Sequence, residues 1–352
     1  MAPLGWGAGL RLALAAGTGL LIWFLPAPAQ VGGQAWHLLA IFVATILGIM
    51  TKPLPMGAVA IVGLAATVLT HTLTLAQALS GFSNSVVWLI VAAFFISRGF
   101  IKTGLGRRIA YHFVAMLGRR TLGLSYSLIA RDLVLAPAIP STTARAGGVI
   151  FPIVSSVARI FDSQPDDGTA RRIGAFLMRT SFQGTIVTGA MSLTGMASNS
   201  LAVELAASRG IEVSWGLWAA AAAVPGVVSL LVIPWLLYIL YPPEIKTTPE
   251  ARRMAKDRLS EMGPAQSNEW ILLFVFLGLL VFWMLGGWLG LSSTATAMSG
   301  LVALLVTGVL TWDDVCREEK AWDTLQSVSA MASPGLPFAS AWRAPGRKLF
   351  WS

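Results

Sequence analysis

The sequence predicts an all-α polytopic membrane protein, and three observations support this fold class. Of the 352 residues, 55% are hydrophobic and only 12% are charged, which is about half the charged fraction of a soluble domain. The mean hydropathy is +0.71. The apolar residues gather in runs close to the roughly 20 residues that a spanning helix needs. Lipid is therefore the expected solvent for about eight to ten hydrophobic helical segments.

Each predicted segment is an apolar run bounded by polar or charged residues. The runs are Leu10 to Leu25, Ala35 to Met50, Met56 to Thr70, Val86 to Ile101, Leu122 to Ile139, Ala146 to Ile160, Ile173 to Leu205, Trp215 to Leu240, Trp270 to Leu289 and Thr294 to Leu310. The first run has an alternative interpretation, because Ala27-Pro28-Ala29 resembles the cleavage site of a signal peptide. In either case the remainder stays in the membrane.

Orientation follows from the lysine and arginine residues between the runs, because cytoplasmic loops carry an excess of them. If the N-terminus is cytoplasmic, the basic loops also lie on the cytoplasmic side, and Arg209 alone departs from this rule. Leu122 to Ile160 must then enter and leave on that side, which predicts a re-entrant hairpin. We therefore expect a multi-pass protein of the cell inner membrane with a cytoplasmic N-terminus.

An internal repeat indicates an inverted-repeat, ion-transporter-like fold. From Trp36, an apolar helix, a turn, a small-residue helix and Leu73-Thr74 follow in order, and the same order recurs from Trp270 to Leu310-Thr311. The first copy starts outside and the second inside, as in transporters built from inverted repeats. The second repeat is incomplete, because prolines 334, 337 and 345 interrupt the tail. This predicts a truncated or frame-shifted product that lacks its second hairpin.

The middle of the hairpin is the first candidate site. Pro137 and Pro140 break the helix there, and Ser141, Thr142 and Thr143 follow. Hydroxyls and exposed N–H groups at the start of the second half-helix are donors for an anion. The alternative is a proline-kinked helix pair whose hydroxyls bond to their own backbone, and the chemistry leaves both open.

The second candidate site is the stretch from Gly189 to Ser200, which is too interrupted for a simple span. Unwound carbonyls at Thr194 and Gly195 could hold a cation, and Asn199 offers both a donor and an acceptor. Small-residue helix packing explains the same composition, and it is the favoured interpretation when the stretch is taken alone.

Charged residues inside the membrane need an explanation, because burying them is costly. Arg131 and Asp132 are expected to neutralise each other at the base of the hairpin. Arg145 follows the hydroxyl triplet, where it would pair with a substrate carboxylate or stand in for a bound cation. The alternative for Arg145 is a structural pair with Asp132.

Several function classes are excluded. The net charge of +9 is spread between apolar runs, so no basic surface for nucleic acid is expected. One cysteine and three histidines leave no internal disulfide and no zinc site of ordinary spacing. The motifs of zinc proteases, nucleotide-binding loops and serine hydrolases are missing. The chain is therefore not expected to be an enzyme, and neither catalytic nor metal-binding residues are predicted.

At the hairpin the chain resembles the divalent anion/sodium symporter family, within it the branch of bacterial citrate and malate carriers and plastid 2-oxoglutarate/malate translocators. The resemblance covers Trp36 to Leu325 and is strongest over Gly81 to Gly106 and Pro140 to Pro152. Family members carry a Ser-Asn-Thr triplet at the tip of each of two hairpins. Here the first triplet reads Ser141-Thr142-Thr143, which weakens the expectation of sodium coordination, and the second triplet is absent.

The resemblance implies a secondary transporter of di- or tricarboxylates such as malate, succinate, 2-oxoglutarate or citrate, working by symport or anion exchange with an elevator motion. No cofactor is implied, apart from Na⁺ as a coupling ion, and the expected assembly is a homodimer in the lipid bilayer. The implied substrate-binding residues are Ser141, Thr142, Thr143, Arg145 and Asn199, and the implied cation-binding residues are Ser141, Thr194 and Gly195. The alternative is a fragment of such a carrier without transport activity.

The expected organisation has seven parts. They are a leading transmembrane helix (1–30), first-repeat scaffold helices with an interfacial helix (31–118), a transport domain of hairpin and broken helix (119–205), a transmembrane helix (206–241), a cytoplasmic loop (242–268), the start of the second repeat (269–325) and an atypical tail (326–352).

Overall fold

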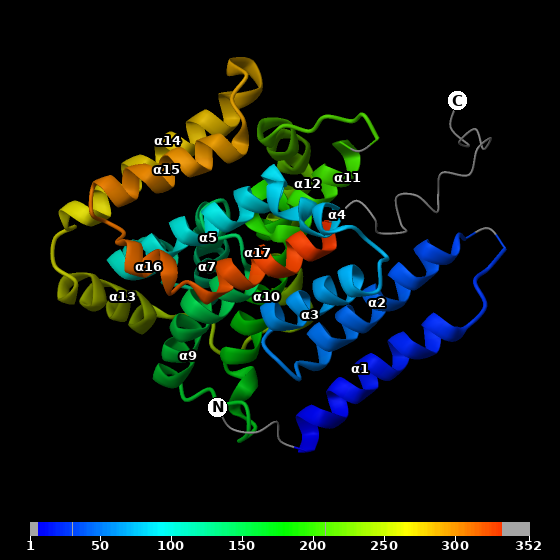
Figure 1. The fold of residues 1–352 in the computed structure, drawn as a ribbon. Coiled ribbons are helices and arrows are strands. Elements are labelled where there is room, and N and C mark those ends of the chain that lie inside the picture. The colour runs from blue at the N-terminus through cyan, green and yellow to red at the C-terminus, as the bar shows by residue number, and fades with distance from the viewer. Residues whose placement is uncertain (1–5, 30, 208, 333–352) are drawn as a thin grey trace, which may run out of the picture. The chain divides into compact units, whose positions relative to one another are not determined.

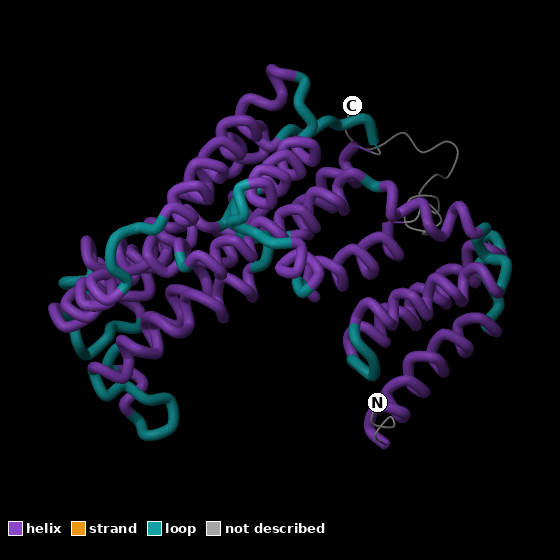
Figure 2. Tube along the Cα trace, turned by 60° about the vertical axis from the view of Figure 1, so that its left-hand side comes forward, coloured by secondary structure: helices purple, strands orange, loops and turns teal. Residues whose placement is uncertain are grey.

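A computed structural model describes residues 6–29, 31–207 and 209–332, and in this part of the chain the regular elements are all helices (Figure 2). The all-α prediction is confirmed. The chain forms two compact units, Met1–Val91 with Glu319–Ser352, and Ala92–Glu318. Among the described residues, five helical stretches are long and apolar enough to cross a membrane. They are Gly7–Phe24, Gly33–Thr51, Ser85–Thr103, Trp215–Leu240 and Ser267–Leu289.

The first unit is built on an antiparallel pair of helices with a third beside them (Figure 1). Its elements are α1 (Trp6–Phe24), α2 (Gly33–Thr51), α3 (Met56–Leu69), α4 (Leu75–Leu79), η1 (Ser80–Ser83), the start of α5 (Ser85–Thr103) and α17 (Glu319–Ala332). The indole of Trp36 donates to the carbonyl oxygen of Ile22 at 2.8 Å, which joins the ends of α1 and α2. α17 packs on α3, where the Gly57 amide donates to Asp323 Oδ1 at 3.3 Å.

The second unit holds the predicted hairpin and the broken helix. Its elements after α5 are α6 (Leu105–Leu117), α7 (Thr121–Leu135), α8 (Thr142–Arg145), the π-helical turn η2 (Ala146–Ile150), α9 (Phe151–Ile160), η3 (Thr169–Arg171), α10 (Gly174–Met191), η4 (Leu193–Gly195), α11 (Ala197–Ala207), α12 (Trp215–Leu240), α13 (Pro249–Glu261), α14 (Ser267–Leu289), α15 (Ser293–Val306) and α16 (Trp312–Cys316). Each predicted apolar run thus contains a helix.

Two segments contain helix that the hydropathy of the sequence did not predict. The predicted loop 242–268 contains α13, a charged helix whose buried Ala251 and Ala255 lie against the core that α6 helps to form. Its apolar residues are too few to signal a helix by hydropathy, yet small side chains on one face are enough for packing. The predicted tail 326–352 begins with the last seven residues of α17. Prolines 334, 337 and 345 lie outside the described residues.

The two ends of the hairpin lie at one end of this unit. At its start, the Thr121 amide donates to the carbonyl oxygen of Lys246 at 3.1 Å. Beyond its end, Arg172 Nη1 donates to the carbonyl oxygen of Asp162 at 3.4 Å, and the Ile245 amide donates to that of Arg172 at 2.9 Å. Both ends therefore meet the segment that follows α12, as a hairpin that enters and leaves on one side requires.

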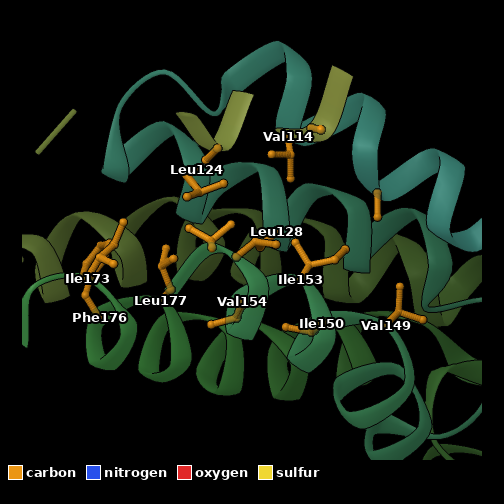
Figure 3. Packing of buried hydrophobic residues seen from close by; sticks show 14 residues of the cluster. Val114, Leu124, Leu128, Val149, Ile150, Ile153, Val154, Ile173, Phe176 and Leu177 are labelled. Carbon is orange, nitrogen blue, oxygen red and sulfur yellow. The ribbon is translucent and has the colours of Figure 1, made fainter. Parts of the chain in front are cut away.

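Apolar side chains from both arms of the hairpin fill a single core. Leu124 and Leu128 of α7 lie opposite Ile153 and Val154 of α9, and Phe176 of α10 lies in the same cluster (Figure 3). All five are at most 3% exposed. Close van der Waals packing of these side chains therefore holds the two arms and α10 together.

The internal repeat is visible in the local structure. α3 and α15 both have 14 residues, and α4 and α16 both have five. After each 14-residue helix comes a left-handed residue, His71 with φ 56° and Gly308 with φ 74°. A threonine then caps the short helix, Thr74 in one copy and Thr311 in the other, each in a capping box. The inverted relation of the two copies stays a prediction.

Candidate functional site

The tip of the hairpin and the break in the second helix pair, both predicted as candidate sites, lie against each other. Thr194 Oγ1 donates to the carbonyl oxygen of Pro137 at 2.9 Å. A Cβ atom placed on Gly189 would lie 2.8 Å from the methyl carbon of Thr142. The structure therefore brings the tip of the hairpin and the break after α10 together, although they are far apart in the chain.

Arg145 joins these two breaks. Its side chain is completely buried. Nη1 donates to the carbonyl oxygen of Ile139 at 2.6 Å and to that of Gly195 at 2.7 Å, while Nη2 donates to that of Thr185 at 3.5 Å. The guanidinium group thus fills a space lined by carbonyl oxygens from the hairpin tip, α10 and η4. The carbonyl of Gly195, a predicted cation ligand, already accepts a hydrogen bond from within the protein.

Asp132 supplies the countercharge for Arg145. Arg145 Nε lies 3.3 Å from Asp132 Oδ1, and Arg131 Nη2 lies 3.6 Å from the same oxygen. Thr188 Oγ1 donates to Asp132 Oδ2 at 2.5 Å. The structural pair of Arg145 with Asp132, one of the two predicted alternatives, is therefore present.

The expected place of Asp132 was wrong. It lies in the last turn of α7, next to the tip and away from the hairpin base, because the helix continues only as far as Leu135. Arg131 and Asp132 are both at most 1% exposed. Two buried guanidinium groups share one carboxylate there, so the cluster carries a net positive charge.

A stripe of small and hydroxyl residues on α10 makes room for this cluster. Its members recur at the spacing of one helix face, and all are buried: Ser181, Gly184, Thr185, Thr188 and Gly189. A Cβ atom on Gly184 would lie 2.6 Å from Ile129 of α7, so the helices approach closely. Thr185 and Thr188 were not identified from the sequence, although this spacing is the signal that could have revealed them.

Asn199 stabilises the break between α10 and α11. Its Nδ2 atom donates to the carbonyl oxygens of Gly189 and Ser192, both at 2.8 Å. These carbonyls lie where α10 ends and have lost their helical donors. Gly195 lies so close to Gly189 that a Cβ atom would come within 2.5 Å of the Gly189 carbonyl oxygen. The donor group of Asn199 is therefore engaged within the protein.

Two indoles of α12 cover the break. Trp218 Nε1 donates to the carbonyl oxygen of Ala190 at 2.9 Å, and Trp215 Nε1 donates to Thr194 Oγ1 at 3.4 Å. Both residues belong to the first turn of α12. The candidate site is thus beside that turn, and the two tryptophans close it on one side.

The hydroxyl triplet differs in exposure from one residue to the next. Ser141 is the N-cap of α8, and its Oγ accepts a hydrogen bond from the Ala144 amide at 3.2 Å. Ser141 and Thr142 are half-buried, whereas Thr143 is exposed. Thr143 is therefore the member of the triplet whose side chain is most accessible to an anion, and the substrate-binding role of the triplet stays a prediction.

Comparisons with known proteins agree with this architecture. Residues 8–334 match the model of the sodium:sulfate symporter transmembrane region. The chain is 56% identical to the putative malate transporter YflS of Bacillus subtilis, over 91% of this chain and 67% of that protein. It is 51% identical to the chloroplastic dicarboxylate transporter 1 of Spinacia oleracea, over 89% of this chain and 55% of that protein. It is 35% identical to the citrate/succinate antiporter of Escherichia coli, over 88% of this chain and 68% of that protein.

These matches confirm the resemblance that the hairpin motif indicated. The family and the three relatives are named as symporters, transporters or antiporters, which also agrees with the prediction that the chain is not an enzyme. The chain spans between 55% and 68% of the length of these relatives.

Proposed function

Since the chain belongs to the sodium:sulfate symporter family, we propose that it carries small di- or tricarboxylate anions across the cell inner membrane by anion exchange. The substrate class is supported by the names of the relatives, which mention malate, dicarboxylates, citrate and succinate. Malate, succinate, 2-oxoglutarate and citrate share two or more carboxylates on a short carbon chain. A buried cluster with a net positive charge suits such an anion electrostatically.

The observation that carries exchange rather than sodium symport is the position of the Arg145 guanidinium. A sodium ion at the hairpin tip would need oxygen ligands, among them the carbonyl of Gly195. That oxygen and the carbonyl of Ile139 both accept hydrogen bonds from Arg145 Nη1. A sodium ion at this place would compete with the guanidinium group for these carbonyls and would be repelled by its charge, which favours exchange over sodium symport. A protein that carries its own positive charge needs no dissolved cation to bind an anion.

The substrate would lie at the triplet, with Thr143 as the principal contact and Ser141 and Thr142 beside it. Asn199, whose donor group is engaged at the break, would support the site without donating to the anion. Thr143 is exposed, and the helix that begins at Thr142 runs on through η2 into α9. Its first N–H groups and its dipole favour negative charge at this end. Arg145 acts from behind the tip as a buried charge.

An elevator motion requires that the hairpin and the broken helix move as one body. The contacts of Arg145 with Gly195 and of Asp132 with Thr188 join them, and the core around Leu128 packs both arms against α10. We therefore assign residues 119–205 to the moving part. The remaining helices would form the scaffold of a homodimer, with the N-terminus cytoplasmic.

The test is uptake of radiolabelled malate by proteoliposomes that contain the purified chain. We expect uptake only when the vesicles are preloaded with unlabelled malate, at the same rate with external sodium or choline. Sodium-driven uptake into vesicles without internal malate would contradict exchange. No uptake under any condition by folded protein would contradict transport and favour the inactive alternative.

A matched pair of variants controls this experiment. Ser141→Ala with Thr143→Ala should reduce exchange at least tenfold, because it removes the proposed substrate hydroxyls. Ser299→Ala with Thr307→Ala removes the same groups at α15, where both hydroxyls donate to backbone carbonyls of that helix, and should leave the rate unchanged.

A further inference from the structure

The first unit contains a large apolar groove between α1, α2 and α3. Its volume is about 390 Å³, larger than the engineered cavities of about 150 Å³ that bind benzene. α1 and α3 each pack against α2, side by side in Figure 1. Among the described residues that line the groove, Thr45 and Thr70 supply the hydroxyl groups and none is charged. Such a groove must be filled by hydrocarbon when the protein is in a membrane.

Small residues are the reason that the groove exists. Its wall includes Ala15 and Gly19 of α1, Ala44 and Gly48 of α2, and Gly63 of α3. Gly48 and Gly63 allow α3 to approach α2 closely, since a Cβ atom at either position would lie within 2.8 Å of a side chain across the interface. Because these side chains are small, an open channel remains where α1 and α3 lie beside α2.

One end of the groove is basic. Residues 1–91 contain two formally charged side chains, Arg11 and Lys52, and no acidic residue. Arg11 Nη1 donates to the carbonyl oxygen of Thr51 at 3.3 Å, and Lys52 follows as the left-handed C-cap of α2, so both charges lie at the same end. Both residues are exposed, and neither forms an ion pair with a described carboxylate. The carboxylate of Asp323 is engaged elsewhere, because its Oδ1 accepts a hydrogen bond from the Gly57 amide at the start of α3.

The opposite end of the groove is aromatic. Trp23 lines it and stacks on His37 with ring centroids 3.9 Å apart, while the indole of Trp36 donates to the carbonyl oxygens of Ile22 and Leu25. Aromatic side chains of this kind anchor helices at the headgroup level of a bilayer. The groove therefore runs between one membrane surface marked by arginine and lysine and another marked by tryptophan.

We propose that this groove is a binding site for an anionic phospholipid, with one acyl chain lying between α1 and α3 and its phosphate beside Arg11 and Lys52. Two cations without a described carboxylate partner, at the mouth of an apolar channel, match a phosphodiester on a hydrocarbon chain in both charge and shape. A helix from a second copy of this chain would fill the channel equally well, but it would leave both charges without a partner. The charges favour the lipid.

Native mass spectrometry of the purified full chain in detergent tests the proposal. The probes are dioleoyl-phosphatidylglycerol and dioleoyl-phosphatidylcholine, which share their acyl chains and differ in net charge. We expect the first bound molecule of phosphatidylglycerol to have at least tenfold higher affinity than the first bound molecule of phosphatidylcholine. Each basic residue near a membrane surface raises the affinity for an anionic lipid by about a factor of five. Equal binding of the two lipids would overturn the proposal.

Two variants separate the charge from the groove. Arg11→Ala with Lys52→Ala should reduce phosphatidylglycerol binding to the level of phosphatidylcholine. Val62→Trp should weaken the binding of both lipids. Val62 lines the groove and is 55% exposed, so the larger ring has room to enter the channel and fill it. A preference for phosphatidylglycerol that survives the loss of both charges would overturn the proposal.

Each variant has a matched control. Arg253→Ala with Lys256→Ala removes two charges from α13, and Val302→Trp enlarges a valine of α15 that is 57% exposed. Neither should change lipid binding. If Val62→Trp instead leaves lipid binding intact and converts a dimer to a monomer, a second copy occupies the groove and the lipid proposal is wrong.

Discussion

Arg145 Nη1 and the carbonyl oxygen of Gly195 are 2.7 Å apart and join two breaks that are 50 residues apart in the chain. Each break exposes backbone groups that a continuous helix would satisfy. The guanidinium group satisfies carbonyls of both at once and adds a positive charge beside the hydroxyl triplet. One residue thus provides both the connection within the proposed transport domain and the charge that the proposed exchange requires.

Removing this guanidinium should destabilise the protein. In Arg145→Met, Asp132 keeps only the more distant Arg131, and the loss of one partner of a buried pair costs about 3 kcal/mol. We expect the unfolding free energy, measured by titration with sodium dodecyl sulfate, to fall by about that amount and malate exchange to cease. Arg145→Met with Asp132→Asn should be less stable still and equally inactive, because Arg131 would then be a buried charge without a countercharge. Exchange at the wild-type rate in either variant would contradict the assigned role.

Thr188 should contribute through its hydrogen bond to the Asp132 carboxylate. Thr188→Val keeps the size of the side chain and removes the donor, and hydrogen bonds to charged groups contribute about 1.5–3 kcal/mol. Thr188→Ser retains the donor and should cost less than about 1 kcal/mol by the same titration. Equal losses in the two variants would show that packing, rather than the hydroxyl group, determines the effect.

Gly195 should not accept a side chain. In Gly195→Ala the Cβ atom would lie 2.5 Å from the carbonyl oxygen of Gly189, so the break must open and carry its carbonyl away from Arg145. We expect at least a tenfold loss of exchange and a loss of about 1–3 kcal/mol in stability. Gly278→Ala, where no atom lies within 4 Å of the added methyl group, is the matched control. A transport rate that is unchanged in Gly195→Ala would argue against a rigid break.

The ion pair of Lys102 with Asp314 should stabilise the protein in a pH-dependent way. Asp314 lies in the short connecting helix α16, outside the spanning helices, and its Oδ2 is 2.5 Å from Lys102 Nζ. Burial acts to raise the pKa of Asp314, but hydrogen bonds from Lys102 and Thr311 and the lysine charge lower it from 3.8 to about 2. Because the pKa is lower in the folded state, the stabilisation is full above about pH 4 and disappears as the pH falls towards 2.

The corresponding measurement is the melting temperature of wild type and Asp314→Asn between pH 7 and pH 3. We expect wild type to melt at a higher temperature at pH 7 and the difference to shrink at pH 3. Asp313→Asn removes the neighbouring, mostly exposed carboxylate that pairs with Arg317, and it should have little effect at either pH. If the difference in melting temperature between wild type and Asp314→Asn does not change with pH, the charge of the carboxylate is not the source of that difference.

The helices themselves were predictable because hydrophobic length is a local property. Trp215 to Leu240 was predicted as an apolar run, and α12 has these bounds. The break at Pro137 was equally predictable, since proline lacks the N–H group that a helix needs. α13 was not predictable in this way, because it packs through the small side chains of Ala251 and Ala255 and not through an apolar run. The role of Thr188 depends on a carboxylate 56 residues away, which no local pattern reveals.

The sequence by itself determined the solvent of this protein, the positions of its apolar helices and the two places where they break, because hydropathy, proline and glycine act within a few residues of the chain. The tertiary structure decided what Arg145 does. From the sequence alone, an arginine that follows three hydroxyl residues could contact the substrate, replace a bound cation or pair with Asp132. Only the meeting of α7, α10 and η4 shows that its nitrogens are used by Ile139, Gly195 and Asp132, because hydrogen bonding and charge pairing depend on distances that folding alone sets.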